Sequence, residues 1–258
     1  QCCLVGSEMC IRDRSYAALQ ADKPLHPHDI NRRDINPDDV NIDILYCGVC
    51  HSDIHMARNE WNNTSIYPMV PGHEIIGIVK EVGSSVTKFK VGDNVGVGVY
   101  VDACEKCDNC NSGKDHYCEE GIVLTYNSYE YGTRNITYGG YSKRIVVKEN
   151  YVIKVPSEMD MKKAAPLLCA GITTYSPLRH FKINSNHKVG IAGLGGLGHM
   201  GLKFASSFGA DVVVFSTSDS KKDEAFEMGA NHFVNVNNSK DVRKHMNSCD
   251  YILDTVSA

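Results

Sequence analysis

Residues 187–210, HKVGIAGLGGLGHMGLKFASSFGA, are the stretch that decides the fold. An apolar segment runs into a cluster of glycines, and a longer segment with apolar residues follows. This order predicts a strand, a tight glycine turn and a helix. Such a unit opens the folds that bind dinucleotides.

The turn places Gly193, Gly195 and Gly198 in the order G-x-G-x-x-G. Gly193 permits the tight turn, Gly195 lets the backbone approach a pyrophosphate, and Gly198 lets helix and strand pack closely. The alternative is a turn that is only structural, but the strand before it and the helix after it favour a binding loop. The residues expected to bind the dinucleotide are Gly193, Leu194, Gly195, Gly196, Leu197 and Gly198.

The end of the next apolar strand indicates which dinucleotide is bound. NAD-binding folds usually carry an acidic residue there, which would repel a 2′-phosphate. This chain has Ser216, Thr217 and Ser218 instead, followed by Lys221. Hydroxyls can donate to a phosphate and the lysine can pair with it, so we expect NADP(H). Asp219 lies only slightly further on and argues the other way.

The segments beyond the loop continue the alternation of strands and helices. DVVVFSTS (211–218), NHFVNV (231–236) and DYILDTVS (250–257) are expected strands of a parallel sheet, with helices between them. Together with the first strand they make about four, whereas a complete dinucleotide fold has six. We therefore expect a truncated, doubly wound parallel sheet over residues 161–258.

The preceding part of the chain has a β pattern. DVNIDILYCGVC (39–50), EIIGIVKEVG (74–83) and GGYSKRIVVKENYVIKVP (139–156) alternate apolar and polar residues between glycine corners. These segments predict a barrel-like β domain over residues 15–160. Residues 1–14 contain three of the eleven cysteines and show no period. They resemble translated adapter sequence, so a non-native, disordered segment is one expectation and an ordinary flexible tail the other.

Composition excludes several classes of protein. The 258 residues carry a formal net charge of -4, without the basic excess of a nucleic-acid-binding protein. No apolar run is long enough to cross a membrane, and no signal peptide is evident. The cysteines cluster at metal-binding spacings rather than at those of a secreted disulfide framework, so we expect a cytoplasmic protein.

Two groups of residues have the composition of metal sites. The first, CEKCDNCNSGKDHYC (104–118), leaves a nucleic-acid finger, a redox centre and a structural brace open when it is considered alone. The second is spread over CGVCHSDIH (47–55), PGHEIIG (71–77) and PLLCAGITTY (166–175). Each of its cysteines and histidines alone could be an ordinary core residue. Together they suit a zinc ion that keeps one position open for substrate.

These motifs, in this order, resemble the zinc-dependent medium-chain alcohol dehydrogenases, most closely the cinnamyl alcohol dehydrogenase-like branch. The resemblance runs from about Ser15 to Ala258 and rests on GVCHSD, PGHE, the four-cysteine segment, CAGITTY and GLGGLG. It implies an N-terminal GroES-like β-barrel catalytic domain followed by a Rossmann domain.

The resemblance also implies roles for the matching residues. Cys50, His73 and Cys169 would bind a catalytic zinc, which Glu74 can approach, whereas Cys47 is not expected to be a ligand. Ser52 would take the alcohol proton, His55 would pass it towards solvent, and Asp53 would hold His73. Thr173 and Thr255 would contact the cofactor. A second, structural zinc would be bound by Cys104, Cys107, Cys110 and Cys118.

The resemblance thus implies reversible conversion of a primary alcohol and NADP⁺ to an aldehyde and NADPH, in a homodimer when the protein is full length. One alternative is an NAD-dependent polyol dehydrogenase of the same superfamily, which a cofactor-preference assay would identify. The other is an inactive zinc- and nucleotide-binding fragment. Trp61 and Tyr126 are candidates for the substrate pocket, although either could equally be core packing.

Overall fold

The structure, a computed structural model, describes residues 11–256. The chain divides into two compact units, Gln1–Cys169 and Ala170–Ala258. The division lies nine residues after the expected boundary between residues 160 and 161. The reason is that α3 (Met161–Ala164) and η3 (Ala165–Leu168) pack their apolar side chains against Ile76 and Val155 of the first unit.

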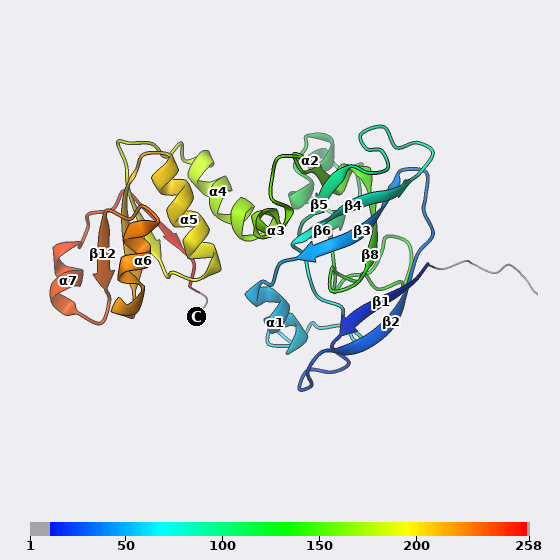
Figure 1. Cartoon of the computed structure of the whole chain (residues 1–258), viewed down its shortest axis with the longest axis horizontal. Coiled ribbons are helices and arrows are strands. Elements are labelled where there is room, and N and C mark those ends of the chain that lie inside the picture. The colour runs from blue at the N-terminus through cyan, green and yellow to red at the C-terminus, as the bar shows by residue number, and fades with distance from the viewer. Residues whose placement is uncertain (1–10, 257–258) are drawn as a thin grey trace, which may run out of the picture. The chain divides into compact units, whose positions relative to one another are not determined.

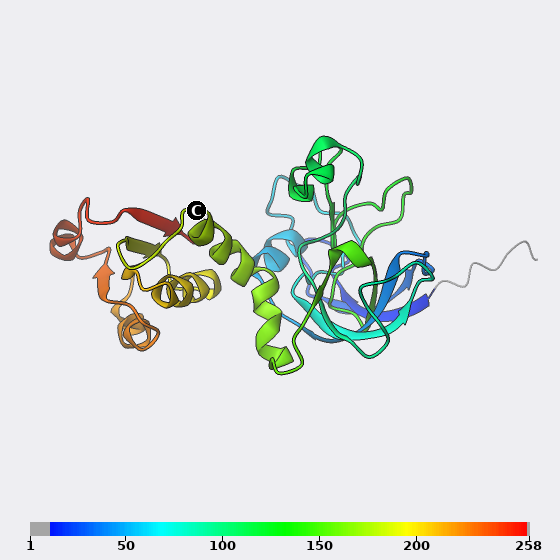
Figure 2. The same ribbon diagram turned by 90° about the horizontal axis from the view of Figure 1, so that it is seen from above.

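The first unit is built on a five-stranded antiparallel sheet, which confirms the β prediction. The strand order is β8-β3-β4-β5-β9, and the strands curve around a common interior (Figure 2). Alternating apolar residues such as Val40 and Ile42 bury one face of the sheet in the core. The strands are β3 (Asp39–Cys47), β4 (Ile75–Val82), β5 (Asn94–Val97), β8 (Arg144–Lys148) and β9 (Val152–Lys154).

Two small sheets complete this unit, β1 (Ile11–Ala17) with β2 (His26–Arg32) and β6 (Tyr100–Asp102) with β7 (Val123–Leu124). Strand β1 begins inside the expected disordered tail, so that expectation is wrong for residues 11–14. The physical reason is Asp13, a buried carboxylate that accepts hydrogen bonds from the backbone N–H groups of Lys143 and Arg144. The rest of the expected tail, residues 1–10, lies outside the described residues.

Short helices occupy the connections of the first unit. They are α1 (His51–Ala57), α2 (Asp108–Asn111), η1 (Asp115–Tyr117) and η2 (Glu149–Tyr151). Helix α1 begins after a connection of three residues from the end of β3, which places the residues of the CHSD motif at the beginning of that helix (Figure 1).

The second unit contains the predicted parallel sheet, in the order β12-β11-β10-β13. Its core contains Val189, Ile191, Leu202, Val212 and Val214, all fully buried. Helices α4 and α5 pack against each other. The strands are β10 (Lys188–Ala192), β11 (Asp211–Ser216), β12 (His232–Asn235) and β13 (Tyr251–Asp254), and the helices are α4 (Ala170–His180), α5 (Gly196–Ser207), η4 (Asp219–Lys221), α6 (Lys222–Glu227) and α7 (Ser239–Lys244).

Within residues 11–256, no helix combines the length and the apolar composition that a membrane span requires.

Candidate active site

The first group of site residues lies at the start of α1. Cys50 is the N-cap residue, and its backbone N–H donates to Asp53 Oδ2 at 3.0 Å. This contact is local, because a carboxylate three residues past an N-cap can reach back to the cap N–H. The sequence CHSD therefore fixes the direction of the Cys50 side chain as the helix forms.

Two distant segments, one with His73 and Glu74 and the other with Cys169, bring further metal-binding side chains to Cys50. Donor atoms of Cys50, His73, Glu74 and Cys169 all lie within 4.8 Å of one another. The sulfurs of Cys50 and Cys169 are 3.9 Å apart. Two sulfurs bound at about 2.3 Å to one tetrahedral zinc lie roughly 3.8 Å apart, so the thiol pair matches zinc and is too far apart for a disulfide.

Glu74 reaches this cluster because residue 48 has no side chain. A Cβ on Gly48 would lie 1.9 Å from Glu74 Oε2. The carboxylate thus occupies the space that any other residue at position 48 would need.

Asp53 orients the imidazole of His73. Its Oδ1 lies 3.0 Å from His73 Nδ1, which leaves Nε2 as the ring nitrogen available to a metal. Burial lowers the pKa of His73, but hydrogen bonds with Asp53 and Cys50 outweigh burial and raise that pKa to about 10. Burial raises the pKa of Asp53, but the hydrogen bonds with His73, Cys50 and Tyr126 outweigh burial, so the pKa is lowered overall.

The two cysteines on either side of Gly48 differ in character. A hydrogen bond with Cys169 is the main cause that lowers the pKa of the Cys50 thiol, to about 3. Burial raises the pKa of the Cys47 thiol to about 12. Cys47 is not among the residues of the metal-donor cluster. Of the two, only Cys50 has the thiolate character of a ligand.

The proton-transfer candidates lie on α1. Ser52 Oγ is 3.5 Å from Cys50 Sγ and therefore borders the donor cluster. His55, one turn later, has its Nδ1 2.6 Å from Glu60 Oε2 and stacks on Trp61. The sequence reasoning missed Glu60; its position five residues after His55, past the end of α1, was the available signal.

The four-cysteine segment forms the second metal-donor cluster. Sulfurs of Cys104, Cys107, Cys110 and Cys118 lie within 4.8 Å of one another. The Cys104–Cys110 and Cys107–Cys110 sulfur pairs are 3.8 and 3.5 Å apart, again close to the spacing of a tetrahedral zinc site. The backbone N–H of Cys104 donates to Cys118 Sγ and lowers the pKa of that thiol to about 6.

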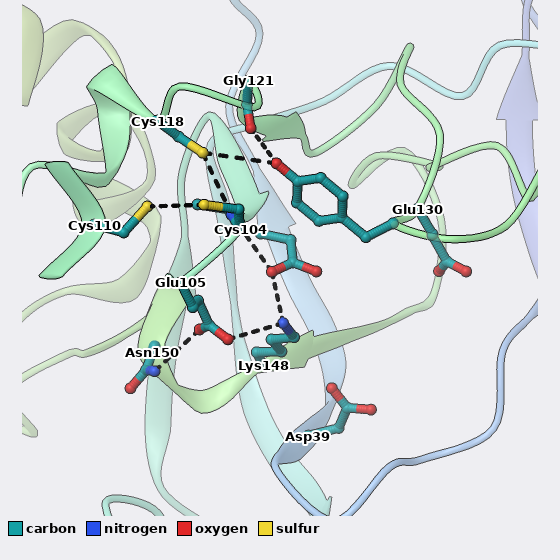
Figure 3. A network of polar contacts seen from close by, with 12 residues as sticks. Asp39, Cys104, Glu105, Cys110, Cys118, Gly121, Glu130, Lys148 and Asn150 are labelled. Carbon is teal, nitrogen blue, oxygen red and sulfur yellow. Dashed lines mark hydrogen bonds and ion pairs between the residues drawn. The ribbon is translucent and has the colours of Figure 1, made fainter. Parts of the chain in front are cut away.

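This segment has little apolar core of its own, since neither α2 nor η1 contains a buried residue. Polar contacts attach it to the sheet (Figure 3). Lys148 Nζ on β8 lies 2.7 Å from Asp102 Oδ1 and 3.1 Å from Glu105 Oε2. The arrangement suits a metal that braces a loop.

The glycine loop lies between β10 and α5 in the second unit. Gly193 has a φ of +84°, and a Cβ on Gly198 would lie 2.1 Å from the Gly193 carbonyl oxygen. By contrast, nothing lies within 4 Å of a Cβ built on Gly195 or Gly196. Gly193 and Gly198 are thus required by the turn and by close packing, while the surface above Gly195 is open for a ligand.

Three of the other expected cofactor residues surround this loop or the end of β11. Lys221 Nζ donates to the Leu194 carbonyl at 2.8 Å, so the lysine lies against the loop. Thr255 Oγ1 donates to the Ala192 carbonyl at 2.7 Å. Ser218 caps η4 by accepting from Ser220 N–H. Thr217 is exposed after β11, Ser216 is buried at its end, and Thr173 is exposed on α4.

Two tyrosines lie beside the metal-donor cluster; the sequence indicated Tyr126 only as a candidate for the substrate pocket or for core packing, and Tyr141 not at all. Tyr126 is buried, and its ring centroid lies 5.8 Å from that of His73. Tyr141 donates its hydroxyl to Asp53 Oδ2 at 3.0 Å. Their only signal in the sequence was proximity to glycine-rich or polar segments, which does not identify a partner.

Comparison with known families gives two matches along the chain. Residues 36–157 match the family described as alcohol dehydrogenase GroES-like domain, and residues 196–258 match the zinc-binding dehydrogenase family. The first range contains both four-residue donor clusters except Cys169, and the second contains the last three residues of the glycine loop, Gly196, Leu197 and Gly198.

Individual proteins are similar over nearly the whole chain. The aldehyde reductase YahK of Escherichia coli is 50% identical over 95% of this chain and 70% of its own length. The NADP-dependent alcohol dehydrogenase C 1 of Mycolicibacterium smegmatis is 51% identical with the same coverage. The crystal structure of CAD from Helicobacter pylori complexed with NADP(H) superposes with a TM-score of 0.91 at 46% identity, covering 96% of this chain and 70% of that one.

Proposed function

Because the chain belongs to the zinc-binding alcohol dehydrogenase family, we propose that it interconverts primary alcohols and aldehydes with NADP(H). The observation that carries this proposal is the convergence of Cys50, His73 and Cys169 on one centre, with donor atoms within 4.8 Å. Two thiolates and one neutral imidazole are a ligand set that leaves zinc with an open position for substrate.

The cofactors and the residues of the site have different roles in the proposed reaction. Zinc supplies Lewis acidity at the substrate oxygen and NADP(H) exchanges the hydride. Ser52 Oγ, which borders the donor cluster, accepts the proton of the substrate hydroxyl during oxidation. Ser52 releases its own hydroxyl proton in exchange, and His55 on the same helix receives it, while Glu60 holds the His55 ring through Nδ1. Asp53 keeps His73 in the tautomer that presents Nε2.

The four-cysteine segment has a structural role in this proposal. Four thiolates fill a tetrahedral zinc site and leave no position for substrate. The chain would therefore contain two zinc ions with different functions.

The cofactor assignment is supported by residues 216–221. Hydroxyls of Ser216, Thr217 and Ser218 and the amine of Lys221 suit a 2′-phosphate, and Lys221 already lies against the glycine loop. The Helicobacter pylori relative was solved with NADP(H).

We further propose that the enzyme acts as a cytoplasmic homodimer on small molecules and binds neither nucleic acid nor membrane. The thiolate ligands support a reducing compartment, and the net charge of -4 offers no attraction for phosphate backbones. Light scattering of the purified protein would test the dimer.

The decisive test is oxidation of NADPH by the purified chain across a panel of aliphatic, aromatic and sugar-derived aldehydes, with NADH as the comparison. We expect turnover with NADPH and primary aldehydes, at a rate that falls when zinc is removed. Preference for NADH, or turnover of polyols alone, would favour the polyol dehydrogenase alternative. Absence of turnover with both zinc ions bound would favour an inactive binding protein.

A further inference from the structure

The segment Gly139–Tyr141 lies directly against the segment that carries His73. The backbone N–H of Gly139 donates to the Val70 carbonyl at 2.7 Å, and that of Gly140 donates to the Gly72 carbonyl at 2.8 Å. Tyr141 N–H donates to the Pro71 carbonyl at 3.0 Å. Three successive residues therefore form backbone hydrogen bonds with the three residues that precede His73.

The contact between the two segments leaves no room for side chains at its glycines. A Cβ on Gly139 would lie 2.4 Å from the Gly72 carbonyl oxygen, and one on Gly72 would lie 2.8 Å from Tyr141 Cδ1. Gly72 also has a φ of +104°, which favours glycine. The close approach fixes the ring of Tyr141 beside Gly72, the residue that precedes His73.

From this position the Tyr141 hydroxyl reaches the carboxylate of Asp53. Asp53 is 2% exposed, so each of its lone pairs needs a donor from the protein. Its Oδ2 accepts from Tyr141 Oη and from Cys50 N–H, both at 3.0 Å. Its Oδ1 pairs with His73 Nδ1 and accepts from Gly72 N–H, also at 3.0 Å.

One buried carboxylate thus connects the backbone of one metal-binding residue to the ring of another, and Tyr141 is one of two tyrosines, with Tyr126, that hydrogen-bond to it. We propose that Tyr141 is a positioning residue of the Cys50–His73–Cys169 metal centre, acting through Asp53. The inference rests on the proposed function, because it assumes that this centre holds zinc. Without the phenol, the carboxylate loses one of its fixed donors, and the geometry of both attached residues loosens.

Tyr141→Phe tests the proposal, with Tyr138→Phe as the matched control. Both rings pack against the same small core of Ala17, Ile30 and Val70, and each substitution removes one hydroxyl. The Tyr138 hydroxyl is not among the donors to Asp53. Zinc release from the purified, zinc-loaded chain is followed with a chromogenic chelator. The kinetic phase of release that is missing in the Cys50→Ala variant belongs to the Cys50 site.

We expect Tyr141→Phe to release zinc from the Cys50 site about tenfold faster than the unmodified chain, the size of effect typical of lost outer contacts. Release from the four-cysteine site should be unchanged, which also shows that the variant is folded. Tyr138→Phe should change neither rate. Equal release rates for the two tyrosine variants would overturn the proposal.

A double-variant cycle separates action through Asp53 from a general packing effect. If Tyr141 acts through Asp53, adding Tyr141→Phe to Asp53→Asn should accelerate zinc release no further. Fully additive effects would contradict that route. If the unmodified chain itself binds no zinc at the Cys50 site, the proposed function fails; if it does and Tyr141→Phe behaves as the control, only this inference fails.

Discussion

At the scale of single residues, Cys47 and Cys50 show how position decides chemistry. They are the same residue type on either side of Gly48 and Val49. Cys50 is turned by the start of α1 towards Cys169, whereas Cys47 ends β3 with its thiol pKa raised by burial. The spacing of the two cysteines resembles a metal motif, but only one of them joins the donor cluster.

This difference predicts the metal content of two matched variants. Cys50→Ala should retain one zinc per chain, and its rate of alcohol oxidation should fall by a factor of about 1,000 or more. The reason is that the lost zinc would stabilise the charge of the transition state by several kcal/mol. Cys47→Ala should retain two zinc ions and most of the activity. Elemental analysis and steady-state rates measure both. Loss of a zinc from Cys47→Ala would mean that the ligand set is misassigned.

The raised pKa of His73 predicts how zinc uptake depends on pH. In the metal-free protein this imidazole holds its proton up to about pH 10, and zinc needs the neutral ring. Binding at neutral pH must therefore displace that proton, so affinity should rise about tenfold per pH unit for each proton displaced. Calorimetry of zinc uptake at the Cys50 site, in buffers of different ionisation enthalpy between pH 6 and 8, counts the protons. An affinity independent of pH would exclude a protonated His73.

At the scale of elements, the glycines of the turn between β10 and α5 have different roles. Gly198→Ala places a Cβ against the Gly193 carbonyl, so it should destabilise the chain by about 1–3 kcal/mol. The Cβ of Gly195→Ala meets nothing within 4 Å, so this variant should lose about 1 kcal/mol or less of folding stability. It should nevertheless weaken NADP⁺ binding, because the pyrophosphate approaches the backbone there. Thermal unfolding and fluorescence titration separate the two effects. Equal losses of stability would contradict this division.

The segment after β11 allows a matched test of cofactor choice. Lys221→Ala should weaken NADPH binding about 10- to 100-fold, as expected for a lost charge-assisted contact, and leave NADH binding nearly unchanged. Lys222→Ala, one residue later at the start of α6, should alter neither. Dissociation constants for both nucleotides decide the matter. A similar loss for NADH would show that Lys221 acts on the loop it touches rather than on the 2′-phosphate.

Helices and strands with a strong hydrophobic periodicity were predictable from the sequence, whereas those fixed by tertiary contacts were not. The alternation in 39–47 and 75–82 predicted β3 and β4, and the glycine loop predicted β10 and α5. Helix α4 was missed, since it contains Pro177, which normally ends a helix. Strand β1 was missed because its order depends on contacts of Asp13 with residues 143 and 144, far along the chain.

At the scale of the whole molecule, the site is assembled from segments that the sequence separates widely. Its ligands come from residues 50, 73, 74 and 169, and local pattern alone cannot show that these meet. The resemblance to a family supplied that information before the geometry did. The contacts around Asp53 show what the resemblance could not supply, because Tyr141 lies 88 residues further along the chain.

Both donor clusters belong to the first unit, and the glycine loop belongs to the second. The proposed function requires that the cluster of Cys50, His73, Glu74 and Cys169 binds a metal ion. Four cysteines at short spacing bind zinc in many proteins, but Cys50, His73 and Cys169 form a substrate-accepting site only if they share one ion.

X-ray diffraction from crystals of the chain, with data on both sides of the zinc absorption edge, tests that claim most directly. We expect two anomalous peaks, one of them about 2.3 Å from the sulfurs of Cys50 and Cys169 and about 2.1 Å from His73 Nε2. A single peak at the four-cysteine site, in protein purified with excess zinc, would contradict it.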